Sequence, residues 1–386
     1  MKIKRNIYLL YAISLLHGMV FYGPIATLYR QAAGVSVFQI TLIESISLAL
    51  CIALEMPWGA VADRIGYKNT MIINCAIYFV SKIVFWKADG FSDFLLERLM
   101  LSVVMAGMSG CDVSILYLSS SEGESHKVFG IYQSLMTAGL LAAAFVYSAF
   151  LKNDYRMAGF LTVLSYGAAA LLTLGLKEVR GAEEKDERKG RFQIELLAVL
   201  KDWRFLLVLI EMALLWETRQ TITVFLSQLQ YVRSGIPPSV MGYIYIVVTL
   251  TGLSGIWSAK VMRKTGMVRF GVWTFGAAAF ACFLLAWTRN PVVSVLGIML
   301  LQLAAALFYP LQLEIQNRHV KSADRATILS IYAVVTEGTG IFTNLLFGRA
   351  AEAGVFVAML LGGVLCLLAG TGFLAWCNQK KYDMIK

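Results

Sequence analysis

Five ionisable side chains lie near the middle of long apolar runs in this sequence: His17, Lys82, Glu217, Arg219 and Glu337. A charge left facing lipid at that depth costs at least about 2.5–3.5 kcal/mol. Such groups therefore pair with one another, become neutral, or line a water-filled cavity. Carboxylates and imidazoles exchange protons and guanidinium groups bind polar solutes, so the pattern indicates a polar path through an apolar barrier.

Each of these residues also has a structural interpretation. His17 is compatible with a neutral histidine in a packed core. Glu217 and Arg219 lie about 200° apart on one helix, so they point to different walls and suit cross-helix pairs. Glu337 suits either an interhelical hydrogen bond or a proton carrier, and Lys82 suits either the membrane surface or a partner on a peripheral helix.

The composition shows what must position these groups. The chain has 386 residues, of which 58% are hydrophobic and only 15% charged. Soluble domains carry about 25% charged residues. With a mean hydropathy of +0.68, the chain lacks solvated surface along its whole length, which indicates an all-α protein embedded in lipid.

Apolar runs long enough to span a bilayer recur along the chain, since a spanning helix needs about 20 residues. The twelve predicted helices are 7–29, 38–61, 70–88, 94–118, 128–150, 157–176, 204–231, 238–260, 268–287, 292–316, 325–348 and 353–377. The longest polar stretch separates the sixth from the seventh. We therefore predict an N-terminal six-helix bundle at 1–176, a cytoplasmic linker at 177–203 and a C-terminal six-helix bundle at 204–386. Residues 192–201 are amphipathic, which is typical of a helix on the membrane surface.

The basic residues orient the chain. Of its 34 lysines and arginines, 24 fall in segments on the same side as the N-terminus and seven on the other. Cytoplasmic loops carry the excess of positive charge, so both termini are predicted to be cytoplasmic. The same clustering explains the net charge of +10 without nucleic acid as a partner.

Other function classes lack sequence support. The six cysteines show no CxxC spacing, and no metal-ligand cluster, nucleophile elbow or P-loop is present. We expect no metal, no cofactor and no catalytic residues. An integral-membrane enzyme or receptor on a similar scaffold is the remote alternative.

One short motif follows the second predicted helix: Gly59-Ala60-Val61-Ala62-Asp63-Arg64-Ile65-Gly66-Tyr67-Lys68. It resembles the signature of the major facilitator superfamily, Gly-x-Leu-Ala-Asp-Arg-x-Gly-Arg-Lys, with Tyr67 in place of an Arg. The resemblance implies twelve helices in two pseudo-symmetric six-helix bundles and a bacterial plasma-membrane location. It also implies alternating access, in which the two halves rock around a mid-membrane site.

The resemblance further implies a conformational latch. In the family the motif's Asp, here Asp63, leans on the start of helix eleven, which here follows Ser322. An anion at a helix N-terminus contributes about 0.3–1 kcal/mol, enough to bias a two-state equilibrium. The latch residues expected on this basis are Gly59, Asp63, Arg64, Gly66, Lys68 and Arg325.

Helices one, four, seven and ten line the central cavity in the family. The cavity residues expected on these helices are His17, Tyr22, Arg98, Asp112, Glu217, Arg219, Gln220, Gln302, Tyr309 and Glu314. Glu217 and Glu337 are the predicted proton-coupling residues.

These observations predict a secondary transporter for a small organic or amphiphilic solute, working as a monomer among membrane lipids. The stretch 135–144 in the fifth helix has small residues where proton-coupled exporters of the family carry a Gly-x-x-x-Gly-Pro-x-x-Gly-Gly pattern, but the Pro is missing, which lowers an exporter assignment without excluding it. Proton-coupled efflux by an antiporter is placed slightly ahead of proton-coupled uptake.

Overall fold

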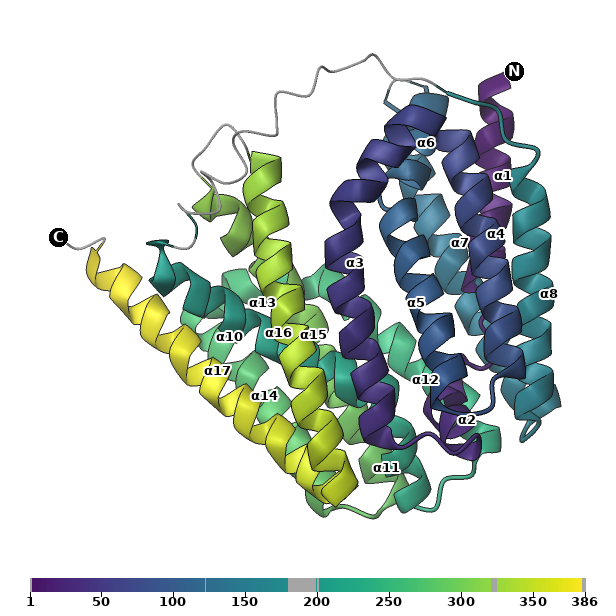
Figure 1. Cartoon of the computed structure of the whole chain (residues 1–386). Coiled ribbons are helices and arrows are strands. Elements are labelled where there is room, and N and C mark those ends of the chain that lie inside the picture. The colour runs from purple at the N-terminus through teal and green to yellow at the C-terminus, as the bar shows by residue number, and fades with distance from the viewer. Residues whose placement is uncertain (1, 122, 180–198, 200, 321–324, 384–386) are drawn as a thin grey trace. The chain divides into compact units, whose positions relative to one another are not determined.

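The computed structural model describes residues 2–121, 123–179, 199, 201–320 and 325–383, and within them every regular element is a helix (Figure 1). The chain divides into two compact units. The N-terminal unit comprises Met1–Glu184 and Pro237–Ile246, and the C-terminal unit comprises Lys185–Ile236 and Val247–Lys386. The predicted linker contains the first of these boundaries, and its predicted amphipathic stretch lies largely outside the described residues.

The helices of the N-terminal unit are built from the first six apolar runs. In chain order they are α1 (Lys2–Gly18), η1 (Gly23–Ile25), α2 (Ala26–Ala32), α3 (Val37–Ile65), α4 (Tyr67–Lys87), α5 (Phe91–Met108), α6 (Cys111–Ser119), α7 (Ser125–Val146), η2 (Tyr147–Leu151) and α8 (Tyr155–Thr173). η5 (Pro238–Val240) and the first half of α12 (Met241–Thr251) group with this unit.

The remaining runs form the C-terminal unit. Its helices are α10 (Trp203–Thr221), η4 (Ile222–Leu226), α11 (Ser227–Arg233), the end of α12, η6 (Gly252–Trp257), α13 (Ser258–Thr265), α14 (Met267–Trp287), α15 (Pro291–His319), α16 (Arg325–Ala353) and α17 (Val355–Asp383).

Among the described residues, eleven helices are long and apolar enough to cross a membrane. The one predicted helix that is not among these eleven is the seventh in chain order, 204–231. It forms continuously through α10, η4 and α11. It is less apolar because it carries Glu211, Glu217 and Arg219. The prediction of an all-α membrane protein is confirmed, and the described helices account for all twelve predicted runs.

The first predicted helix is interrupted. α1 ends at Gly18 and helical structure resumes at Gly23, which frees backbone groups from the helical ladder. The carbonyl oxygen of His17 accepts a hydrogen bond of 2.7 Å from the Tyr166 hydroxyl on α8. Non-helical backbone at membrane depth is stable when protein groups satisfy it in this way. The non-helical segment carries Tyr22, which is buried in the unit.

α1 and α7 cross at two glycines. A Cβ atom on Gly139 would overlap the carbonyl oxygen of Leu15, and one on Gly18 would overlap that of Met136. Small residues let helix backbones approach this closely. Close packing against α1 therefore accounts for Gly139, one of the small residues of the fifth predicted helix.

Replacing Gly139 by Ala is expected to destabilise the protein by about 1–3 kcal/mol, because the added methyl group meets a backbone oxygen that has no room to move. Gly130→Ala is the matched control on the same helix, since a Cβ there has open space. Thermal denaturation in detergent measures the stability of the two purified variants. Equal melting temperatures for the two variants would contradict the tight crossing.

Candidate functional site

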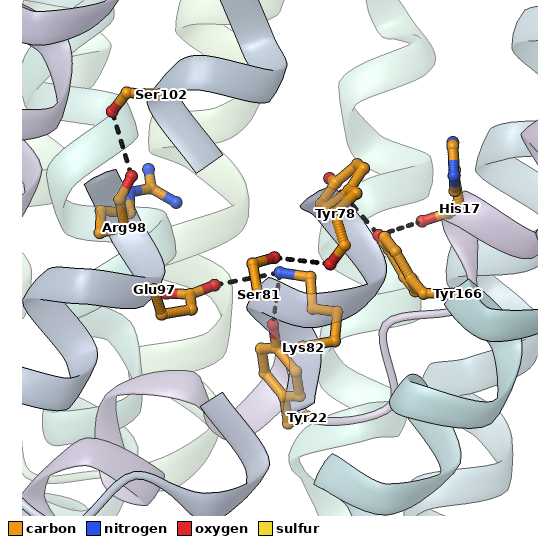
Figure 2. A network of polar contacts seen from close by, with 9 residues as sticks. All are labelled: His17, Tyr22, Tyr78, Ser81, Lys82, Glu97, Arg98, Ser102 and Tyr166. Carbon is orange, nitrogen blue, oxygen red and sulfur yellow. Dashed lines mark hydrogen bonds and ion pairs between the residues drawn. The ribbon is translucent and has the colours of Figure 1, made fainter. Parts of the chain in front are cut away.

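A group of buried and half-buried charged side chains lies inside the N-terminal unit, and we call it the N-terminal charge network: Arg30, Glu44, Lys82, Glu97 and Arg98, with the hydroxyl of Tyr22. Lys82 on α4 and Glu97 on α5 are only 4% and 1% exposed. Lys82 Nζ donates to Glu97 Oε1 at 3.1 Å and to the Tyr22 hydroxyl at 3.0 Å, as Figure 2 shows. This lysine therefore bridges three segments of the unit.

The surroundings of Lys82 are aromatic. The rings of Tyr78 and Tyr166 lie 5.1 and 5.4 Å from its Nζ atom, and Tyr22 stacks on Phe85 with ring centroids 3.9 Å apart. A desolvated cation gains about 2 kcal/mol from an aromatic face. The aromatic residues of α4, of α8 and of the segment between α1 and η1 thus make a buried ammonium tolerable.

The other charges of the network leave an imbalance. Arg98 NH2 pairs with Glu44 on α3 at 2.5 Å. Arg30 on α2 is 7% exposed and lies over the rings of Phe85 and Phe94, within electrostatic reach of Glu97. No carboxylate among the described residues forms an ion pair with it. Three cations therefore face two carboxylates.

Glu97 is incompletely satisfied. Its Oε1 atom receives Lys82, but its buried Oε2 atom has no hydrogen-bond partner among the described residues. Nearly all buried polar atoms are hydrogen-bonded, so this acceptor is available to a proton or a water molecule. It is a place where a proton can be added without breaking an existing hydrogen bond.

Two of the four N-terminal cavity predictions, Tyr22 and Arg98, belong to this network. His17 lies beside it, with its ring 5.1 Å from those of Tyr78 and Tyr166. Asp112 lies elsewhere: it is in the first turn of α6 and accepts a hydrogen bond of 2.8 Å from the Tyr132 hydroxyl on α7.

Sequence reasoning missed Glu97 and Arg30. Glu97 stands next to Arg98 in an otherwise apolar helix, and that isolated acid was the available signal. Arg30 falls one residue beyond the predicted end of the first helix, where a basic residue looks like an ordinary loop charge. The residue instead lies on α2, which extends the helical run to Ala32, and its guanidinium lies over the rings of Phe85 and Phe94.

A second polar site lies in the C-terminal unit, and we call it the Arg219 pocket. It encloses about 170 Å³ and is lined by Trp216, Arg219, Gly252, Gly255, Gln302, Ala306, Tyr309 and Pro310. Arg219, 9% exposed, donates from NH1 to Gln302 at 3.2 Å and from NH2 to Gln220 at 2.7 Å. Its guanidinium carbon lies 4.0 Å from the centre of the Trp216 ring, which stacks on Tyr309. The structure thus brings together Arg219, Gln220, Gln302 and Tyr309.

The other C-terminal candidates lie outside this pocket lining. The Glu217 carboxylate packs against Gly340 on α16, whereas Arg219 faces α15, which confirms that the two residues point to different walls. Glu314 pairs with Arg318 one turn further along α15, near the C-terminal end of that helix. Glu337 lies on α16, one turn before Gly340.

The latch residues are only partly described. Gly66, with φ of 83°, is the N-cap residue that precedes α4, and the Glu178 carboxylate accepts from the Lys68 backbone N–H at 3.5 Å. Arg64 is exposed, and Arg325 donates to the Asn317 side chain at 2.8 Å within the C-terminal unit. The side chains of Gly59 and Asp63, and residues 322–324, lie outside the described residues. The latch therefore stays a prediction.

Comparison with known proteins gives one consistent result. A family model described as the Major Facilitator Superfamily matches residues 7–344. The nucleoside transporter NupG has a similar structure, with a TM-score of 0.81 and 17% identity over 96% of this chain and 98% of that one. A bacterial homolog of the human lysosomal transporter Spinster gives 0.73 and 16% over 96% of both chains. A D-xylose–proton symporter gives 0.71 and 12% over 96% of this chain and 97% of that one.

Proposed function

Because the chain belongs to the Major Facilitator Superfamily, and is therefore a multi-pass membrane transporter rather than an enzyme, we propose that it moves a small polar organic solute by alternating access coupled to protons. Two predicted bundles of six helices each suit this mechanism, in which paired bundles expose one site to either side in turn. The proposed location is a bacterial plasma membrane, with both termini cytoplasmic and the chain acting as a monomer.

The observation that carries the proton coupling is the environment of Glu97. Its second carboxylate oxygen is buried and unpartnered, while the first holds Lys82. A proton on Glu97 removes the charge that attracts Lys82, an attraction of about 4 kcal/mol for unit charges 4 Å apart at the effective dielectric of a protein. Protonation would thus loosen α4 from α5. Glu211 on α10 also has an unpartnered oxygen, but no described cation pairs with it.

Glu217 and Glu337, the sequence-based candidates for proton coupling, stay predictions. Both have interaction partners, so neither is an isolated acid in an apolar environment. Glu97 is preferred because its protonation has a defined structural consequence, the release of Lys82.

For the direction of transport we propose uptake by symport. The Arg219 pocket offers a guanidinium and an amide, which suits a polar solute better than an amphiphilic one. Two of the structural relatives are named for a nucleoside and for D-xylose with protons. The small residues of the fifth predicted helix lack the Pro of the exporter pattern, and one of them, Gly139, is explained by the α1 crossing.

Solute flux into proteoliposomes tests this proposal. The purified full chain is reconstituted and exposed to radiolabelled nucleosides, sugars and monocarboxylates, with the interior made alkaline relative to the medium. We expect accumulation of at least one solute, abolished by a protonophore and absent from empty liposomes. Accumulation driven instead by an acidic interior, where protons leave as solute enters, would indicate proton/solute exchange and so favour efflux. Equilibration unaffected by the gradient would contradict proton coupling.

A further inference from the structure

We infer that the Arg219 pocket binds the carboxylate of a small ring-shaped organic acid. This inference rests on the proposed function and names the class of solute. It is carried by the unused hydrogen-bonding capacity of Arg219 and by the shape of the pocket around it.

Arg219 is a buried cation with donors to spare. A guanidinium has five N–H groups, and the described contacts of Arg219 use one on NH1 and one on NH2, both toward neutral amide oxygens. Its Nε atom is buried without a hydrogen-bond partner. No carboxylate lies within ion-pair distance of it in the part of the chain that the structure describes. The nearest acid along the helix, Glu217, packs against Gly340.

This arrangement fits an anion better than a neutral solute. A buried charge is costly unless it is paired, and a planar guanidinium matches the two oxygens of a carboxylate. A sugar hydroxyl could bond to Gln302 or Gln220 but would bring no negative charge to a guanidinium that Glu217 supports only through space. A carboxylate supplies both the charge and the acceptors that the site lacks.

The pocket walls favour a flat ring. Trp216 and Tyr309 are stacked with ring centroids 4.6 Å apart and form an aromatic wall beside the guanidinium. A Cβ on Gly252 would come within 2.7 Å of Gln302 Nε2, and one on Gly255 within 3.0 Å of the Ala306 oxygen, so the glycines keep α15 close to η6. The pocket volume of about 170 Å³ compares with a cavity of about 150 Å³ that holds benzene.

Binding to the purified full chain in detergent tests the inference. The probes are benzoate, nicotinate and cyclohexanecarboxylate, each compared with its neutral amide by thermal shift and calorimetry, since a ligand of the folded form raises its stability. We expect at least one carboxylate to bind and its amide to bind at least about tenfold more weakly, because a hydrogen bond to a charged group contributes that much affinity.

Arg219→Gln is expected to lower the affinity for that carboxylate by at least about tenfold, whereas Arg204→Gln, which removes an exposed charge from the same helix, leaves it unchanged. Arg219→Lys keeps the positive charge but loses the planar guanidinium that binds both carboxylate oxygens. This variant replaces Arg219→Gln in the binding experiment if the Gln variant does not fold. We expect it to bind more weakly while still preferring the carboxylate over the amide.

Three results would overturn the inference: no carboxylate binds, an amide binds as tightly as its acid, or Arg219→Gln and Arg219→Lys both bind like the wild type. Proton-driven flux of sugars or nucleosides without carboxylate binding would overturn it and leave the proposed function standing. Carboxylate binding without proton-driven flux would support it and contradict the coupling.

Discussion

Replacing Glu97 by Gln is expected to lower the free energy of unfolding by about 3–5 kcal/mol, because it leaves the buried charge of Lys82 without its counterion. The loss should be at the upper end of this range. Arg30, which also lies near Glu97, already has no ion-pair partner among the described residues. After the substitution, Glu44 is the remaining carboxylate of the N-terminal charge network.

Adding Lys82→Met to Glu97→Gln should recover most of that stability, since removing both members of a buried pair is often neutral or stabilising. Lys82→Met alone should cost less than Glu97→Gln, because Arg30 stays near the carboxylate. Thermal and denaturant unfolding in detergent measure all three variants. Glu314→Gln, which breaks the exposed pair with Arg318, is the control and should stay within about 1 kcal/mol of the wild type. A Glu97→Gln protein as stable as the control would contradict this description of the network.

The second large effect concerns proton coupling. Lys82→Met/Glu97→Gln, which is expected to fold, should exchange solute between equal pools but fail to accumulate it when a pH gradient is imposed. A gradient of one pH unit is worth about 1.4 kcal/mol per proton, so the wild type should reach accumulation of up to about tenfold at one proton per solute, and the variant none.

The controls for this experiment separate coupling from solute binding. Glu55→Gln replaces an exposed acid on α3 and should accumulate solute like the wild type. Glu217→Gln and Glu337→Gln test the two sequence-based candidates in the same assay. If Lys82→Met/Glu97→Gln accumulates solute like the wild type, while Glu217→Gln or Glu337→Gln does not, the residue that binds the transported proton lies in the C-terminal unit.

Much of the fold was predictable because each membrane-spanning helix corresponds to an apolar run that is long enough to cross a bilayer. The motif at 59–68 supplied the family and thereby the helices that line a cavity. Arg219, Gln302 and Tyr309 lie on two of those helices, and the structure places them around one pocket. These residues are polar groups in apolar helices, so the sequence alone marks them.

The pairing of charged side chains across helices was not predictable, because a helix that is apolar on every face does not reveal which face points inward. Lys82 and Glu97 are 15 residues apart on α4 and α5, and their pairing depends on how these helices pack. The position of Asp112 was predicted by counting through helix four as if it were continuous. Gly110, in a left-handed conformation with φ of 82°, instead starts a new helix and turns Asp112 toward Tyr132.

The most direct test of proton coupling at Glu97 is proton movement caused by solute alone. Proteoliposomes containing a pH-sensitive dye start with equal pH on both sides, and the transported solute is added outside. Symport predicts that the interior acidifies with the wild-type protein and not with Lys82→Met/Glu97→Gln, although solute enters both. Solute entry without any pH change in the wild type, or the same acidification with the double variant, would contradict the account.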